Sequence, residues 1–158
     1  MEYLMMYSWA IVVILVAVGA LAYFKVLSPQ DLLTGQTIFE SPIQNIDDAT
    51  FTLGSNSIEI ALQNNKGVPI MIPRTGTFDS SQCTSGSIIS IKATKTGTDI
   101  TPTTRILEEE RFIIKWTCTP SSGTKPGDRI KADIVFDYKN VETGQLLKQT
   151  GYVQGKWS

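Results

Sequence analysis

The side chains best suited to distinctive chemistry are two cysteines, Cys83 and Cys118, each in a Ser/Thr-rich stretch, SSQCTSG and KWTCTPSSG. No CxxC or CxxCH motif accompanies them, and two thiolates cannot complete a tetrahedral zinc site. We expect a structural disulfide; two unpaired thiols are the alternative. The bridge would close a loop of about 35 residues, stabilise the fold by roughly 3–4 kcal/mol and place the domain outside the cytoplasm.

Histidine is absent from the chain, which removes the commonest metal ligand and the base of Ser-His and Cys-His pairs. The acidic run Glu108, Glu109 and Glu110 stands at a strand entry, where adjacent side chains point to opposite faces and do not converge. Asp47 and Asp48 supply too few of the roughly six to eight oxygens that calcium needs. The sequence therefore predicts no catalytic residue, no cofactor, no metal site and no enzyme.

The overall charge argues against nucleic acid as a partner. Fourteen Lys and Arg residues against fifteen Asp and Glu residues give a formal net charge of −1, whereas phosphate backbones are bound by basic surfaces. The 158 residues suffice for one hydrophobic segment and one globular domain of roughly 125 residues. We predict no nucleic-acid binding.

The opening stretch reads MEYLMMYSWAIVVILVAVGALAYFKVLSP, and its residues 3–24 carry no charge. As a helix these 22 residues would be about 33 Å long, close to the bilayer hydrocarbon thickness of about 30 Å. The run IVVILVAV is apolar on every side, so the helix has no polar face with which to lie on a surface. We predict a long hydrophobic helix that membrane or protein surrounds.

The flanking charges discriminate among three roles for this segment: a cleaved secretory signal, a membrane anchor and a part of the mature protein. A signal peptide starts with basic residues and has an apolar core of about 7–15 residues, but here Glu2 comes first and the run is longer. An anchor would place Lys25 in the cytoplasm, where a disulfide does not persist. Removal of basic residues ahead of Met1 would resolve this conflict. Glu2 then either caps the helix at an interface or pairs with an α-amino group.

Both ends of the chain resemble one protein family. Residues 1–11, MEYLMMYSWAI, followed by an Ile/Val/Leu/Ala run, resemble the N-terminal segment of archaeal type IV-like pilins, the subunits made with a class III signal peptide. Residues 127–157, GDRIKADIVFDYKNVETGQLLKQTGYVQGKW, look like the closing strands of the same proteins. In such pilins a basic leader is cleaved and the apolar helices of many copies bundle into a filament core. No leader is present here, so Met1 is either a processed end or a start placed too late.

The resemblance implies four assembly residues, Glu2, Tyr3, Tyr7 and Trp9. The family glutamate maps to Glu2, where it neutralises the N-terminal amine of a neighbouring subunit during assembly. By this resemblance the chain is a pilin, the structural subunit of an archaeal type IV-like extracellular filament for surface attachment or cell contact. Its partners would be copies of itself in a helical homopolymer, the plasma membrane before assembly and the archaeal pilus assembly machinery.

Two alternatives to the pilus subunit stay open. Archaellins share the general plan, so an archaellum filament subunit is one of them. The other is a single-pass membrane-anchored extracellular β-sandwich that acts as a binding module, with Ser/Thr-rich loops that recognise a partner.

After Lys25 the pattern changes, because Pro29 disfavours helical geometry at the preceding residue. Period-two or β-branched segments bounded by turn sequences then predict about seven short strands. These segments are residues 50–53, 57–63, 68–72, 87–94, 111–118, 129–138 and 145–157. Pro69 marks its strand as an edge or a bulge. The alternation identifies Ile58, Ile60, Leu62, Ile130, Ala132, Ile134 and Phe136 as core candidates.

The predicted fold class is accordingly α+β. A long N-terminal hydrophobic α-helix and a linker occupy residues 1–35, and an antiparallel β-sandwich, immunoglobulin-like in its two-sheet plan, occupies residues 36–158.

Overall fold

A computed structural model of the full chain describes residues 2–23, 35–83 and 86–158, with the side chains of the helix described over residues 7–20. The chain divides into two units, Met1–Thr34 and Gly35–Ser158. Each unit is described by itself.

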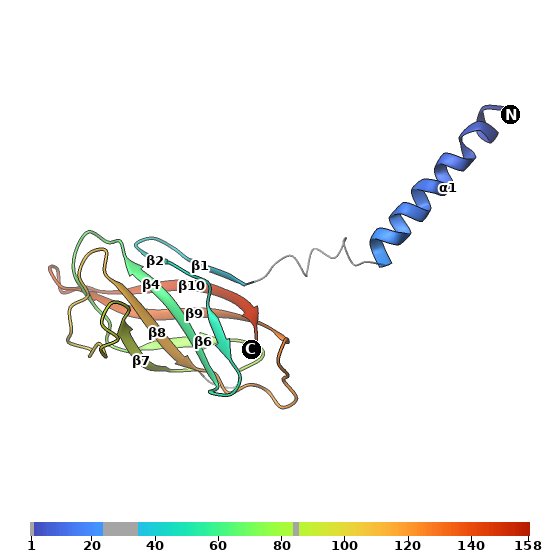
Figure 1. The fold of residues 1–158 in the computed structure, drawn as a ribbon. Helices are drawn as coiled ribbons and strands as arrows, with labels where there is room; N and C mark the ends of the chain where they lie inside the picture. Colours follow the sequence, from blue (N-terminus) through green and yellow to red (C-terminus); the bar gives the residue numbers. More distant parts are fainter. Residues whose placement is uncertain (1, 24–34, 84–85) are drawn as a thin grey trace. The chain divides into compact units, whose positions relative to one another are not determined.

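The first unit contains one helix, α1, over Glu2–Tyr23 (Figure 1). Its sequence has no proline and only one glycine, Gly19, so nothing in it breaks the helix. Along the described parts of the chain, no helix is both long and apolar enough to span a membrane.

The predicted α+β class with a long N-terminal hydrophobic helix is wrong. The part of the chain that the structure describes has ten strands and one helix, so the protein is mainly β. Fold class is decided by the elements that pack into layers around a core, and here every residue of the described core belongs to the second unit.

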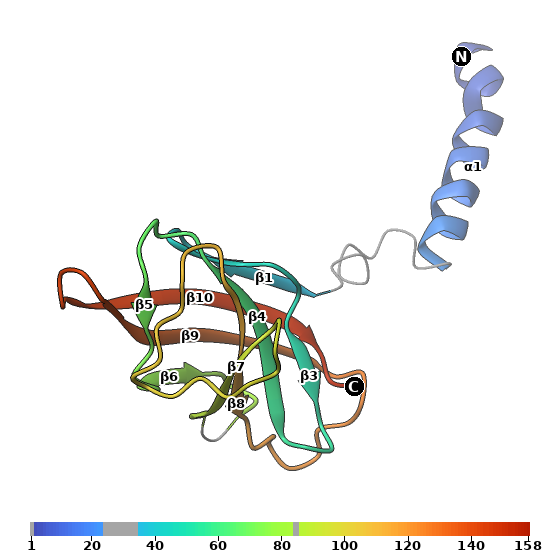
Figure 2. The same ribbon diagram turned by 60° about the vertical axis from the view of Figure 1, so that its left-hand side comes forward.

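The second unit consists of two antiparallel sheets, which Figures 1 and 2 show from two directions. One sheet has the order β1-β10-β9-β5, with β6 also paired to β9; the other has the order β2-β4-β8-β7, with β3 also paired to β4. This arrangement is consistent with the predicted β-sandwich. The strands are β1 Gln36–Phe39, β2 Ile43–Asn45, β3 Thr50–Thr52, β4 Ser57–Asn64, β5 Ile70–Met71, β6 Gly76–Asp79, β7 Ile88–Ala93, β8 Arg111–Thr117, β9 Arg129–Asn140 and β10 Leu146–Lys156.

The core lies between the facing sides of the two sheets. Alternation of buried and more exposed residues along β4 and β9 places every second side chain inward. All seven predicted core residues are buried, with exposed fractions from 0 to 3%. The prediction of these positions is therefore confirmed. Aromatic side chains contribute to the core, with ring centroids 6.1 Å apart for Phe51 and Trp157 and 6.3 Å apart for Phe78 and Trp116.

The two ends of the unit tie the sheets together. The Ser41–Pro42 peptide bond is cis and lies where the chain passes from β1 in one sheet to β2 in the other. At the other end Trp157 forms a parallel bridge with Phe51, and the Leu53 backbone N–H donates to the Ser158 carbonyl at 3.1 Å. The hydrophobic core and the contacts that join the two sheets lie within this unit alone, so we expect residues 35–158 to fold without α1.

Candidate functional site

The first candidate site is the surface of α1. Every large apolar side chain described in this helix has 48 to 68% of its area exposed, from Val18 to Trp9. The six consecutive residues from Ile11 to Val16 are all apolar and exposed. Successive helical residues are about 100° apart, so these six cover the whole circumference. The helix therefore has no polar face, and an apolar surface of this kind marks a site of association.

Covering this surface would release considerable free energy. Full burial of a Val, Leu or Ile side chain contributes about 1.5–3 kcal/mol, so the six residues from Ile11 to Val16 represent on the order of 10 kcal/mol per copy. This driving force is not directional. Many identical neighbours could therefore cover the helix as favourably as a single partner.

The structure describes two of the four predicted assembly residues. Tyr7 and Trp9 have 62 and 68% of their area exposed. They are two positions apart, hence about 200° apart around the helix axis, so they do not converge on one site. Glu2 and Tyr3 lie within α1, but their side chains are outside the described residues.

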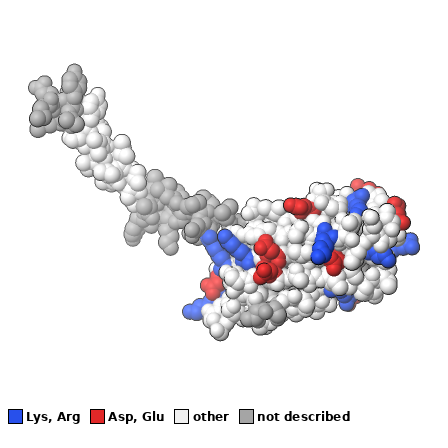
Figure 3. All heavy atoms as spheres, turned by 180° about the vertical axis from the view of Figure 1, so that it is seen from behind, with Lys and Arg blue, Asp and Glu red and all other residues white. Residues whose placement is uncertain are grey.

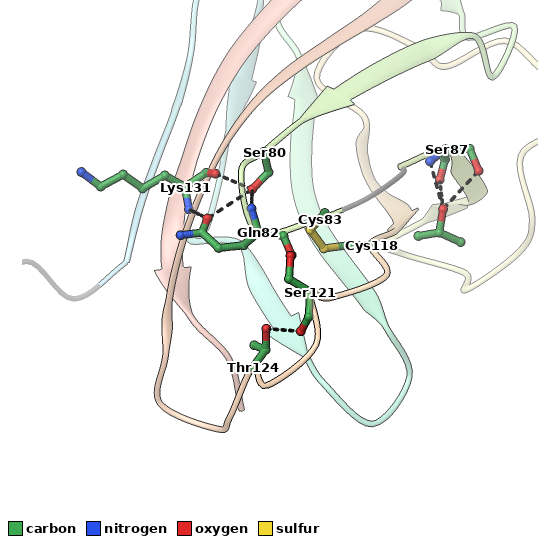
Figure 4. Close-up of a disulfide and its surroundings, with 9 residues drawn as sticks. Ser80, Gln82, Cys83, Ser87, Cys118, Ser121, Thr124 and Lys131 are labelled. Carbon is green, nitrogen blue, oxygen red and sulfur yellow. Dashed lines mark hydrogen bonds between the residues drawn. A yellow bond between two sulfur atoms is a disulfide. The ribbon is translucent and has the colours of Figure 1, made fainter.

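The structure joins Cys83 and Cys118 in a disulfide, with Cα atoms 5.3 Å apart and Cys118 fully buried (Figure 4). Cys83 follows β6 of one sheet and Cys118 follows β8 of the other, so the bridge links the two sheets. Hydrogen bonds hold the same region: the Ser80 hydroxyl donates to the Lys131 carbonyl at 2.8 Å, and the Ser121 backbone N–H donates to the Gln82 carbonyl at 2.9 Å. The bridge has a structural role.

A hollow of about 580 Å³ lies beside the acidic run. Glu108, Glu109 and Glu110 form a turn ahead of β8, and Glu110 accepts a hydrogen bond from the Leu107 backbone N–H at 2.8 Å. Buried Asn64 holds this turn in place. Its side-chain amide donates to the Leu107 carbonyl at 3.1 Å, and its backbone carbonyl accepts a hydrogen bond from the Glu109 backbone N–H at 2.8 Å. These contacts explain the turn structurally.

The described residues contain no group of three or more His, Cys, Asp and Glu side chains that could hold a metal ion. The acidic turn therefore lines a hollow, but its carboxylates are not arranged to bind a metal ion. Its chemistry is that of solvated carboxylates beside an exposed leucine, Leu107, with 57% of its area exposed.

Comparison with known proteins adds no family to this picture: no protein-family model matches the chain, and no curated protein matches it. The candidate site therefore rests on the geometry of α1. The period-two pattern identified most strands in advance, but it gave no signal for the pairing of β6 with β9, which places Asp79 opposite Asp133.

Proposed function

We propose that the protein is a structural subunit of an extracellular filament of the archaeal type IV-like pilus class, polymerising through α1. The observation that carries this proposal is the apolar, exposed surface of α1 in a chain whose core is complete without it. A helix of this composition requires other apolar surface around it. The N-terminal resemblance to pilins supplies the class.

The physics of such an assembly is consistent. Copies of α1 that bury one another remove apolar surface from water, and contacts between different faces of neighbouring copies extend without limit where the rotation between copies does not close into a ring. Repetition of such contacts makes a helical fibre, with the β units outside. The disulfide supports an extracellular location, because such bridges persist in oxidising compartments. The machinery that assembles pili of this class is the expected partner.

Assembly of purified protein tests the proposal. The full chain would be purified in detergent, the detergent removed by dialysis, and the product examined by negative-stain electron microscopy. We expect fibres from the full chain and none from residues 35–158, the matched control that lacks α1. Peptide mapping of filaments sheared from producing cells provides the cellular measurement. A full chain that forms no fibres and is found only in membrane fractions would act as an anchored binding module instead.

A further inference from the structure

The outer face of the sheet that contains β9 and β10 carries an unusual arrangement of like charges. Arg129 on β9 lies directly opposite Lys156 on β10, and Lys131, two residues further along β9, points to the same side. Lys131 and Lys156 are exposed, and Arg129 is half-buried. Like charges directly opposite one another destabilise a sheet. We call Arg129, Lys131 and Lys156 the basic group.

A group of the opposite sign lies next to it on the same face. Asp133 on β9 is directly opposite Asp79 on β6, and Glu40 follows β1; all three carboxylates are exposed. Neither Asp79 nor Asp133 has a hydrogen bond or ion pair through its side chain with another described residue. Asp133 is two positions after Lys131, or about 7 Å along the strand. We call Glu40, Asp79 and Asp133 the acidic group.

Apolar side chains lie beside the acidic group. Ile38 on β1 is opposite Tyr152 on β10, and Ile38 has 49% of its area exposed. The Tyr152 hydroxyl donates to Gln154 Oε1 at 3.1 Å, which fixes the ring on this face. A shallow hollow of about 270 Å³ is lined by Ile38, Glu40, Asp133, Thr150, Gly151 and Tyr152. The face thus combines apolar contact area with two patches of opposite charge.

We propose that this face pairs with the same face of a second copy of the chain. A two-fold axis between the basic and acidic groups sets the basic group of each copy against the acidic group of the other. Figure 3 shows Lys and Arg side chains at both ends of the β unit in this view, with Asp and Glu side chains beside and between them. A partner of one sign, such as a nucleic acid or an acidic peptide, would match one group and be repelled by the other. A second copy matches both.

This contact is isologous and closes on itself, so it forms pairs and does not extend a fibre. It involves residues of the second unit only. The inference therefore stands or fails independently of the proposed assembly through α1.

Sedimentation of residues 35–158, the unit with its own complete core, tests the pairing. We expect a monomer–dimer equilibrium between 10 μM and 1 mM (roughly the range of weak association), with a Kd at least about tenfold higher in 0.5 M than in 0.05 M salt because salt screens the charges. A monomer at every concentration in low salt would overturn the proposal.

Charge reversal tests the geometry. We expect Asp79→Lys/Asp133→Lys to be monomeric, because both groups then carry a net positive charge. We expect Lys131→Glu/Lys156→Glu to be monomeric as well, because both groups then carry a net negative charge. Mixing the two variants restores dimers, and so does combining all four substitutions in one chain. Dimerisation of either double variant at the wild-type Kd, or a mixture that stays monomeric, would contradict the proposal.

A reversal on the other sheet is the matched control. Lys92 and Asp99 are exposed and lie opposite each other across an isolated bridge, outside the proposed face. Lys92→Glu/Asp99→Lys keeps the net charge and should leave the Kd unchanged; loss of dimers in this variant would contradict the assignment to the β9–β10 face. Circular dichroism verifies the fold of each variant. If a reversal unfolds the unit, Asp79→Asn/Asp133→Asn replaces it and should raise the Kd severalfold, with an unchanged Kd counting against the proposal.

Discussion

Gly151 on β10 and Phe39 on β1 are directly opposite each other, and the Phe39 ring occupies the space that a side chain at Gly151 would need. A Cβ atom at Gly151 would lie 2.2 Å from Phe39 Cε1, well inside van der Waals contact. Phe39 is 6% exposed, and its ring centroid is 6.2 Å from that of Phe136 in the core. The glycine is what allows β1 to pack its only aromatic side chain inward.

We predict that Gly151→Ala lowers the free energy of unfolding of residues 35–158 by about 1–3 kcal/mol, because the added methyl group displaces a packed ring. Urea denaturation followed by circular dichroism measures the change. Gly54→Ala is the control, since no atom lies within 4 Å of a Cβ added there, and it should change stability by less than about 0.5 kcal/mol. Equal effects at the two glycines would refute the packing explanation.

The core and the local elements were accessible from sequence for a physical reason. Alternation along β4 and β9 is a local property, so Ile58 and Ile134 could be assigned to the core without knowing their partners. Pro69 likewise identified its segment as weak, and β5 is a two-residue strand at the edge of its sheet. These two predictions, each of which depends only on a chain segment and its own neighbours, are confirmed.

What could not be predicted depends on contacts between distant segments. β1, β2 and β6 are only three or four residues long and are defined by their partner strands, so no periodic pattern revealed them. The pairing of Asp79 with Asp133 joins residues from two such distant segments. The prediction of the fold class was wrong for a similar reason. The apolar character of a segment predicts a helix, but it does not say whether that helix contributes a layer to the fold.

The disulfide should account for a substantial part of the stability of the β unit. Replacing Cys83 and Cys118 by alanine, or reducing the bridge, is expected to lower the free energy of unfolding by roughly 3–4 kcal/mol, since a loop of about 35 residues is no longer closed in the unfolded chain. Urea denaturation with and without reductant measures this. Mass spectrometry after alkylation of the native protein provides the direct assay, and two reactive thiols in unreduced protein would show that the bridge does not form.

Asn64 is expected to be the polar residue on which the 107–110 turn depends. It is fully buried, and its amide nitrogen donates to the carbonyls of Val68 at 2.9 Å and Leu107 at 3.1 Å. Asn64→Ala removes the donor to these part-buried carbonyl groups, which should cost about 1–3 kcal/mol. Asn65→Ala is the matched control: its side chain is exposed and hydrogen-bonded only to Gln44 among described residues, so a change below about 0.5 kcal/mol is expected. Similar losses at both positions would contradict this role.

From the resemblance to pilins we expect Glu2 to pair with the N-terminal amine of a neighbouring copy. We predict that Glu2→Ala and Glu2→Gln each reduce the yield of fibres about tenfold, equivalent to about 1.4 kcal/mol per subunit contact. Glu2→Asp, which keeps the charge, should retain more of the yield than either. The thermal unfolding of the β unit should be the same in all three variants. Wild-type fibre yield from Glu2→Gln would remove this role for the carboxylate.

Val13 lies near the middle of the described part of α1 and has 56% of its area exposed. If copies of α1 cover one another, Val13→Lys buries an unpaired charge, and a cost of several kcal/mol should abolish fibres in the detergent-removal assay. Val13→Leu keeps the surface apolar and should assemble normally. Both variants should leave the unfolding transition of the β unit unchanged, because Val13 takes no part in its core. Fibres from Val13→Lys at the wild-type yield would show that α1 is not the buried element of the assembly.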